Sequence, residues 1–237
     1  MNTEEEVIIS LESQKAHSSV ARKNLSITSS IRRKTYLSLK RLFDILVGAA
    51  GTIATIPVVG IVKLVNIKNG DFAPVIYSQT RIGKNGKKIK IYKIRSMIPN
   101  ADEVLLELLE DPKYREEWGQ YQKLKDDPRI TKIGHIIRKT SLDEFPQFFN
   151  ILRGDMSLVG PRPLVEGELD GHKGNHEVYE SVKPGLTGWW GANGRSNVSY
   201  NERLQQEYYY IENQGLVLDI KCIVKTAKSI IKKDGAK

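Results

Sequence analysis

Cysteine is almost absent from this 237-residue sequence, which has a single one at position 222. A lone cysteine excludes an intramolecular disulfide framework and a cysteine-based zinc site. Histidine is also scarce, and the four that are present show no metal-ligand spacing. Only His172 and His176 stand four residues apart, and Gly171 and Gly174 disfavour the helix that would bring them onto one face. We therefore predict no zinc site.

Acidic residues are outnumbered, with 28 Asp and Glu against 37 Lys and Arg, which gives a formal net charge of +9 at pH 7. Such a charge implies an anionic partner: nucleic acid, acidic phospholipid or a phosphorylated substrate. The lysines are scattered and no known nucleic-acid-binding motif is present, so we predict no nucleic-acid partner. A hydrophobic content of 40% with 27% charged residues is typical of a globular protein of one or two domains.

Residues 1–37 contain few apolar side chains. They begin with the acidic run Glu4-Glu5-Glu6 and continue rich in Ser, Thr, Asn and Lys. This composition cannot bury enough apolar surface to fold alone, so we interpret residues 1–37 as a mobile N-terminal tail. No basic start followed by an apolar core is present, and the segment does not resemble a signal peptide.

Only one long hydrophobic run is present, the 18 charge-free residues from Ile45 to Val62. As a straight helix it would be about 27 Å long, close to the roughly 30 Å thickness of a bilayer's hydrocarbon core. Pro57 lies well inside the run and should kink or break a helix there. Gly48, Gly51 and Gly60 weaken the helix further.

Basic residues flank this run on both sides, whereas a spanning helix normally has its excess of Lys and Arg on one side only. The flanking cations are Arg32, Arg33, Lys34, Lys40 and Arg41 before the run, and Lys63, Lys68 and Arg81 after it. We therefore predict a re-entrant helix-break-helix over residues 38–68, with both ends at the cytoplasmic face. A single spanning helix and a buried helix of a soluble core are the alternatives.

Residues 69–237 are predicted to form an α+β domain that is mostly helical and has a small β-hairpin. Asn85-Gly86 is a strong two-residue hairpin signal, and it precedes the alternating segment Ile89–Ile94. A capping box of Asn100 and Glu103 predicts a helix over 101–110, and a second helix is expected at about 113–125.

A basic amphipathic helix is predicted at Asp219–Lys233. Apolar residues recur there at helical spacing, and lysines occupy another face. Such a helix can lie in the lipid interface. It can equally pack on the domain with its lysines in water.

Asp143 and Glu144 are adjacent carboxylates that follow the basic cluster around Arg138. Ser141 and Glu144 match a capping box, which places both carboxylates in the first turn of a helix. A purely structural interpretation is that they cap this helix and complement its dipole. The same position favours phosphate binding and an ionised carboxylate. Such a carboxylate can attack phosphorus, while its neighbour holds a divalent ion.

Two further stretches present cations. Lys93 and Arg95 alternate with an apolar residue at the end of the hairpin, and Arg162 stands between Pro161 and Pro163. Proline on both sides restricts the backbone around Arg162, which suits a presented side chain. Taken alone, each stretch is equally compatible with solvated strand-end charges or with a plain turn.

These motifs together resemble the bacterial sugar transferases, the monotopic polyprenyl-phosphate phosphoglycosyl transferases. The resemblance extends in order from about residue 38 to the end. It is carried by Lys40–Asp44, Tyr92–Met97, Asp127–Thr131, Arg138–Gln147, Leu152–Pro163, Val182–Gly188, Gly194–Ser196 and Tyr208–Asn213. One departure is Ile56, where the family often has a serine before the membrane proline.

The resemblance implies a re-entrant membrane segment, a catalytic domain at the cytoplasmic face of the bacterial inner membrane, and a two-step reaction that depends on Mg²⁺. By analogy, Asp143 attacks the sugar-bearing phosphate and releases the nucleoside monophosphate. The lipid substrate, a polyprenyl phosphate, then takes the sugar phosphate from Asp143. Glu144 would bind Mg²⁺.

The resemblance also suggests substrate contacts. Arg138 would bind phosphate, with Lys93 and Arg95 as weaker candidates, and the Pro161-Arg162-Pro163 loop would contact the nucleotide. The segment from Lys183 onward resembles members that transfer hexose phosphates in exopolysaccharide or capsule assembly, which points to UDP-glucose or UDP-galactose. The alternative is a catalytically inactive, membrane-tethered regulator or scaffold of polysaccharide assembly. We also expect a homodimer.

Overall fold

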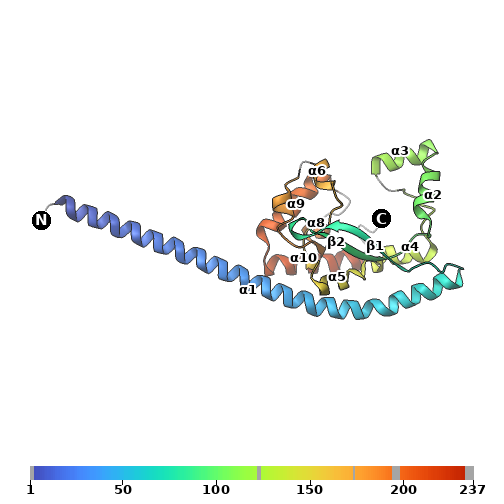
Figure 1. Ribbon diagram of the computed structural model, residues 1–237, viewed down its shortest axis with the longest axis horizontal. Helices are drawn as coiled ribbons and strands as arrows, with labels where there is room; N and C mark the ends of the chain where they lie inside the picture. The colour runs from blue at the N-terminus through green and yellow to red at the C-terminus, as the bar shows by residue number, and fades with distance from the viewer. Residues whose placement is uncertain (1–2, 122–123, 173, 194–197, 233–237) are drawn as a thin grey trace. The chain divides into compact units, whose positions relative to one another are not determined.

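The computed structural model describes residues 3–121, 124–172, 174–193 and 198–232, and Figure 1 shows its helices and strands. The helices are α1 (Thr3–Lys68), α2 (Ala101–Leu108), α3 (Pro112–Tyr121), α4 (Lys132–Lys139), α5 (Gln147–Arg153), α6 (Glu168–Gly171), α7 (His176–Tyr179), α8 (Trp189–Asn193), α9 (Tyr200–Asn213) and α10 (Leu216–Lys232). The strands are β1 (Ile76–Ile82), β2 (Lys88–Ile94), β3 (Ser157–Val159) and β4 (Gly185–Thr187), and two 3₁₀ turns occur at Lys84–Gly86 and Leu142–Glu144. A mostly helical chain with a little sheet is confirmed.

The chain divides into two units within α1, at Phe43 and Asp44. The first unit is helical from Thr3 onward, and it includes residues that we interpret from the sequence as a tail. Their mobility stays a prediction. The expected motif Gly194-Arg195-Ser196 lies outside the described residues.

The part of α1 around Pro57 differs from the sequence prediction, because the expected helix break is absent. The helix continues through Pro57 to Lys68. Two threonine hydroxyls just before the proline donate to carbonyls four residues back, Thr52 to Gly48 at 2.6 Å and Thr55 to Gly51 at 2.8 Å. Threonines bonded in this way bend helices, and proline does the same. The helix therefore accommodates Pro57 by curving rather than by stopping (Figure 1).

Gly48 and Gly51 allow α1 to pack closely on α5. A Cβ at Gly48 would lie 2.7 Å from the Leu152 backbone nitrogen, and one at Gly51 would lie 2.2 Å from the Phe148 ring. Asp44 is buried one turn earlier, where its Oδ1 accepts hydrogen bonds from the Leu158 N–H at 2.8 Å and the Ser157 hydroxyl at 3.1 Å. Gly48 and Gly51 therefore provide space for close packing of α1 on α5, and they do not break the helix.

Many apolar side chains in this part of α1 are exposed. Ile45, Leu46, Ile53, Ile56, Ile61, Leu64 and Ile67 are all exposed. Within the described residues, Ser30–Lys68 is the one helical stretch that is long and apolar enough to cross a membrane, judged by length and composition. Only 17% of its most apolar window is buried. This low burial argues against the alternative of a buried helix in a soluble core.

The β1–β2 hairpin matches its prediction. The strands pair antiparallel from Ile76 opposite Ile94 to Ile82 opposite Lys88. Asn85 and Gly86 both have positive φ, 57° and 71°, as a type I′ turn requires. The side-chain amide of Asn150 covers the other edge of β2 by accepting from the Tyr92 N–H and donating to the Lys90 carbonyl.

Among the residues that the structure describes, three apolar clusters hold the second unit together. One joins α1 to the hairpin and α4 through Val62, Val75, Ile94 and Ile137. Another packs β2 on α5 through Ile89, Ile91, Ile151 and Met156. The largest lies among β3, α9 and α10 and includes Tyr210 and Cys222. A short parallel pairing of β3 with β4, which the sequence did not predict, lies between the second and third of these clusters.

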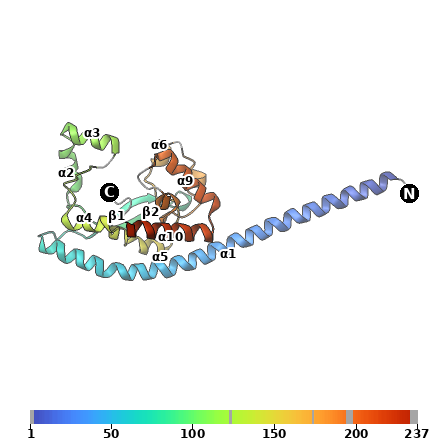
Figure 2. The same ribbon diagram turned by 180° about the vertical axis from the view of Figure 1, so that it is seen from behind.

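The predicted helices are present with shifted ends. α2 and α3 fall where two helices were expected, but the Asn100 side chain makes no capping hydrogen bond. The C-terminal amphipathic helix is α10, which lies on the near side of the molecule in Figure 2. It buries Leu218 and the fully enclosed Cys222 against the domain. Leu216, Val217, Ile220 and Val224 remain exposed, so the helix both packs on the domain and presents an apolar face.

Candidate active site

Asp143 and Glu144 lie in a single 3₁₀ turn between α4 and α5. The predicted capping box is wrong: Ser141 makes no side-chain capping bond, and α5 begins only at Gln147. Ser141 instead has the left-handed conformation, with φ of 56°, which reverses the chain after α4. For a residue other than glycine this conformation costs about 1–3 kcal/mol, and such strain is common at functional sites.

Lys93, at the end of β2, lies beside the two carboxylates. Its Nζ is 3.2 Å from Glu144 Oε1, and both side chains are partly accessible to solvent. Arg138, on the last turn of α4, is also close enough to act on the charge of Asp143. The fold therefore brings Lys93, Arg138, Asp143 and Glu144 into one site, although Lys93 and Glu144 are 51 residues apart in the sequence.

The pKa of the Asp143 carboxyl is raised to about 6. Burial is the main cause and the negative charge of Glu144 the second, while Lys93, Arg138 and the backbone N–H of Asp143 act in the opposite direction. The sequence-based explanation, that the start of a helix keeps this carboxylate ionised, is therefore wrong, because no α-helix begins at Asp143. With a pKa near 6, roughly nine-tenths of the carboxyl is still ionised at pH 7.

Arg138 is oriented by a single hydrogen bond, from its Nε to the Ser96 hydroxyl at 2.7 Å. Its side chain is otherwise exposed, and among the described residues no hydrogen bond engages its two terminal nitrogens. A guanidinium held in this way presents two parallel donors, the geometry that suits a phosphate group. Ser96 belongs to the Tyr92–Met97 motif, but sequence analysis assigned it no role, because nothing in its local pattern distinguishes it from any other strand-end serine.

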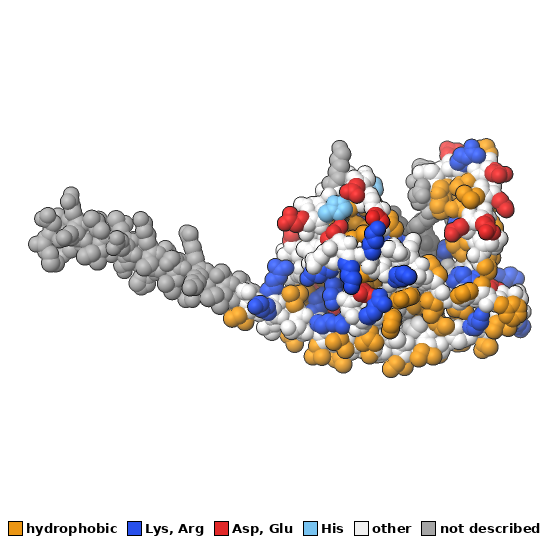
Figure 3. Space-filling view, in the orientation of Figure 1, with side chains coloured by type: hydrophobic (Ala, Val, Ile, Leu, Met, Phe, Trp, Pro, Cys, Tyr) orange, Lys and Arg blue, Asp and Glu red, His pale blue; other side chains and the backbone are white. Residues whose placement is uncertain are grey.

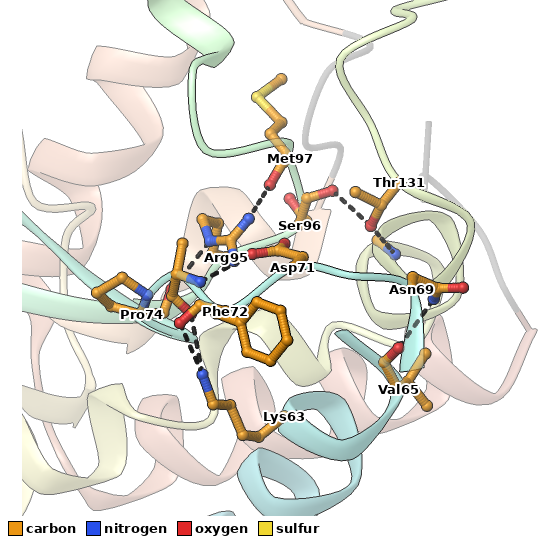
Figure 4. Close-up of polar contacts among 12 residues, drawn as sticks. Lys63, Val65, Asn69, Asp71, Phe72, Pro74, Arg95, Ser96, Met97 and Thr131 are labelled. Atoms are coloured by element: carbon orange, nitrogen blue, oxygen red, sulfur yellow. Dashed lines mark hydrogen bonds and ion pairs between the residues drawn. The ribbon is translucent and has the colours of Figure 1, made fainter. Parts of the chain in front are cut away.

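All three nitrogens of the Arg95 guanidinium donate hydrogen bonds (Figure 4). Its Nη2 donates to both carboxylate oxygens of Asp71 at 2.9 and 2.8 Å, its Nε to the Pro74 carbonyl, and its Nη1 to the Met97 carbonyl. The guanidinium thus fastens the loop after α1 to the end of β2. This geometry favours a structural role over the phosphate contact expected from the sequence.

The same junction supports Arg138. The carbonyl of Ser96 accepts from the backbone N–H of Thr131 at 3.0 Å, and Thr131 caps α4 by accepting from the Gly134 N–H (Figure 4). Lys63, near the end of α1, donates to the carbonyls of Phe72 and Ala73. Hydrogen bonds therefore lead from the end of α1 through residues 71–96 to the helix that carries Arg138.

Asp127 and Arg129 form a buried pair that holds the α2–α3 segment. Arg129 donates through Nε and Nη2 to the two Asp127 oxygens at 2.8 and 2.7 Å, and through Nη1 to the Ala101 carbonyl. Burial raises the pKa of Asp127, but the hydrogen bonds from Arg129 outweigh it and the pKa is lowered. The sequence motif Asp127–Thr131 thus has a structural role at the base of this segment.

The Pro161-Arg162-Pro163 loop lies at the other end of the hairpin. The Ile82 N–H donates to the Leu164 carbonyl at 2.8 Å, which ties the loop to the turn end of β1. Ile82 pairs with Lys88, and Lys93 is five residues further along β2, so the two places are about 17 Å apart along the strand. Arg162 is exposed and lines a cavity of about 290 Å³ that includes Tyr179.

Glu207 stabilises the Pro161-Arg162-Pro163 loop, and sequence analysis did not identify this residue. It is only 1% exposed, and its Oε1 accepts from the Arg162 N–H at 3.1 Å. Burial raises its pKa to about 7, against the opposing effects of that hydrogen bond and of Arg203. The Arg203 guanidinium lies over the rings of Trp190 and Tyr200, 4.8 Å from each centroid.

A bound Mg²⁺ is compatible with the carboxylates present. Among the described residues no group of three or more His, Cys, Asp and Glu side chains gathers to form a complete metal cage. Mg²⁺ does not need one, because it commonly keeps several waters and binds one or two carboxylates together with substrate phosphates. Glu144 is partly exposed and adjoins Asp143, so it suits this kind of site.

A carboxylate pair flanked by cations, next to a helix with an exposed apolar face, is the arrangement expected of a membrane-associated transferase of phosphorylated groups. The family described as bacterial sugar transferase matches residues 35–233, and the chain belongs to this family.

Three relatives illustrate the similarity. The chain is 46% identical over 213 residues to the UDP-galactose-lipid carrier transferase of Erwinia amylovora, and 45% identical over the same length to the undecaprenyl-phosphate galactose phosphotransferase of Salmonella typhimurium. These matches cover 90% of this chain but 44% of each relative, so the chain spans less than half of their length. The exopolysaccharide production protein ExoY of Sinorhizobium fredii is 42% identical over 196 residues, which cover 81% of this chain and 84% of that protein.

Proposed function

We propose that the chain transfers a hexose 1-phosphate from a UDP-sugar to a polyprenyl phosphate and releases UMP. The observation that carries this proposal is the half-buried Asp143, which has Glu144, Lys93 and Arg138 around it. The names of the relatives support the substrates, since they include a galactose phosphotransferase that uses undecaprenyl phosphate and a UDP-galactose transferase.

The reaction proceeds in two displacements. The ionised Asp143 carboxylate attacks the phosphorus that bears the sugar, and the bond from this phosphorus to the bridging oxygen breaks, so that UMP leaves with the electron pair. A phosphate oxygen of the polyprenyl phosphate then attacks the same phosphorus. The bond to Asp143 breaks, which restores the carboxylate and forms a polyprenyl diphosphate sugar.

The surrounding residues bind and orient the phosphates. Arg138 contacts phosphate through its exposed guanidinium, and Lys93 neutralises charge near Glu144. Glu144 would hold Mg²⁺, which would offset negative charge on the diphosphate. The Pro161-Arg162-Pro163 loop receives the nucleotide end of the UDP-sugar, and the length of the hairpin separates this loop from the reacting phosphate.

Residues 38–68 are proposed to enter the cytoplasmic leaflet of the inner membrane and to leave by the same leaflet, which makes the protein monotopic. The exposed apolar side chains from Ile45 to Ile67 support this placement, as do the basic residues at both ends. The continuous curvature of α1 through Pro57 takes the place of the sharp break expected from the sequence. Residues 69–237 would then form the cytoplasmic catalytic domain.

UDP-galactose is the favoured donor and UDP-glucose the alternative, in exopolysaccharide or capsule assembly. The relatives' names favour galactose, and ExoY is named for exopolysaccharide production. The other function, an inactive membrane-tethered scaffold, gains no support from the site, since Asp143, Glu144, Lys93 and Arg138 lie together there. A homodimer stays a prediction.

The test is transfer from radiolabelled UDP-galactose or UDP-glucose to polyprenyl phosphate, with UMP release as a second readout. The Asp143→Asn variant should lose transfer by at least a thousandfold, whereas Asp126→Asn, an exposed aspartate outside the site, should retain it. Removal of Mg²⁺ with a chelator should also stop the wild-type reaction. Equal activity of wild type and Asp143→Asn would refute the proposed nucleophile, and no turnover with any UDP-sugar would favour the scaffold.

A further inference from the structure

A basic hollow of about 490 Å³ lies between β2 and the end of α5. It is lined by Lys87, Lys88, Ile89, Lys90, Tyr92, Arg153 and Asp155. We refer to the surface that these residues form as the basic hollow. None of them belongs to the site around Asp143 or to the Arg162 loop, and the proposed reaction uses none of them.

The basic hollow carries excess positive charge. Its single carboxylate, Asp155, already accepts a hydrogen bond from Arg153 Nε at 2.5 Å. Lys88 pairs with Glu166 at 2.7 Å, near the surface. Within the part of the chain that the structure describes, neither hydrogen bonds nor ion pairs engage the amino groups of Lys87 and Lys90. Among the described residues, these two exposed cations therefore have no anion that neutralises them.

The alternation of side chains along β2 places Lys88, Lys90 and Tyr92 of the basic hollow away from the site around Asp143. Successive side chains of a strand point to opposite faces, so Lys88, Lys90 and Tyr92 leave β2 on the face opposite to Lys93. Lys93 is the residue that reaches Glu144. An anion bound in the basic hollow would consequently be a different group from the phosphate that reacts at Asp143.

The basic hollow borders the apolar surface of the domain. The Arg153 guanidinium lies over the rings of Tyr92 and Phe149, about 6 Å from each centroid, and Phe149 is 43% exposed. On the neighbouring faces of α5, Leu152 and Phe148 contact α1 at Gly48 and Gly51. In Figure 3, Lys and Arg side chains gather where β2 and α5 lie in Figure 1, above a band of hydrophobic side chains.

We infer that the basic hollow binds the headgroup phosphate of an anionic phospholipid. Cations beside an apolar rim match a lipid whose phosphate is at the bilayer surface and whose chains lie below it, and basic side chains in this position are attracted to anionic leaflets. Free phosphate would make no use of the exposed Phe149. The inference rests on the membrane placement in the proposed function, but it does not depend on catalysis by Asp143.

The experiment measures lipid binding to the full chain in detergent micelles by native mass spectrometry, with phosphatidylglycerol and phosphatidylcholine as the two probes. Wild type should bind phosphatidylglycerol at least tenfold more tightly. The Lys87→Ser/Lys90→Ser variant should lose this preference, because it removes the two unpaired cations and keeps both ion pairs. The matched control, Lys113→Ser/Lys125→Ser, removes the same charge from exposed positions elsewhere and should behave as wild type.

Equal affinity of wild type for the two lipids, or equal loss in the variant and the control, would overturn the inference. A second arm tests the lipid substrate as the ligand. In nanodiscs of phosphatidylcholine alone, Lys87→Ser/Lys90→Ser should leave the KM for polyprenyl phosphate unchanged, and a rise would assign the basic hollow to that substrate instead. Asp143→Asn should bind phosphatidylglycerol normally, which separates failure of this inference from failure of the catalytic proposal.

Discussion

The ammonium group of Lys93 lies 3.2 Å from a carboxylate oxygen of Glu144, which joins the last part of β2 to the turn that carries Asp143. Burial is the main cause that raises the pKa of Asp143, and the charge of Glu144 raises it further. The positive charge of Lys93 lowers it, and the balance places the pKa at about 6. The reactivity of Asp143 therefore depends on two neighbours with opposite effects.

The first prediction concerns pH. Because only the ionised Asp143 can attack phosphorus, kcat/KM should fall as the pH decreases below about 6, the pKa of this carboxyl. Lys93→Met removes a charge that lowers this pKa, so its acidic limb should move to higher pH. Glu144→Gln removes a charge that raises it, so the limb should move to lower pH. Single-turnover pH profiles measure both shifts, and identical limbs in all three proteins would contradict the assignment.

Arg95 and Arg138 should respond differently to substitution. Arg95→Lys loses hydrogen bonds to the largely buried Asp71 carboxylate, so it should reduce the free energy of unfolding by roughly 1–3 kcal/mol. The KM for the UDP-sugar should hardly change in the folded fraction. Arg138→Lys should raise that KM and lower kcat with little effect on stability, because its guanidinium is exposed. Thermal denaturation and steady-state kinetics of both variants measure these effects. A loss of stability in Arg138→Lys and a raised KM in Arg95→Lys would mean that Arg95 binds the substrate and Arg138 is structural.

The packing of α1 on α5 can be tested by substituting the glycines of α1. Gly51→Ala would place a Cβ 2.2 Å from the Phe148 ring, so α1 and α5 must separate at a cost of about 1–3 kcal/mol. Gly60→Ala is the matched control, since its added methyl group would meet no atom within 4 Å, and alanine favours the helix by about 1 kcal/mol. Thermal unfolding in detergent should show a lower Tm for Gly51→Ala and an equal or higher Tm for Gly60→Ala. Equal effects would mean that α1 does not pack there.

The membrane topology predicts equal accessibility on both sides of residues 45–62. Cysteines at Ser38 and Asn69, each in a Cys222→Ala background, should both resist an impermeant thiol reagent added outside intact cells. Both should react after the cells are opened. Labelling of one of the two from outside would establish a spanning helix instead.

Local patterns predict several elements correctly because short-range chemistry determines them. Asn85-Gly86 forces a turn through its positive φ values, and the alternation after it produces β2. The capping box at Ser141 fails because the sequence pattern does not reveal that Ser141 takes a left-handed conformation. Gly48 and Gly51 indicate only a weakened helix when the sequence is considered locally, whereas their packing role depends on α5, about a hundred residues later.

Contacts distant in sequence account for what could not be predicted. The approach of Lys93 to Glu144, the hydrogen bond from Arg138 to Ser96, and the support of the Arg162 loop by Glu207 all join elements across more than 40 residues. No local spacing contains this information. The resemblance supplied the residues of the site, and the fold shows which of them meet.

The most direct test of the account is to trap the covalent intermediate. Full-length protein is incubated with a radiolabelled UDP-hexose, without polyprenyl phosphate, then denatured and analysed by peptide mass spectrometry. We predict one hexose phosphate per active site, on the peptide containing Asp143, and release of the label on adding polyprenyl phosphate. A preparation that transfers sugar phosphate normally but carries no adduct at Asp143 under any quench condition would contradict the mechanism.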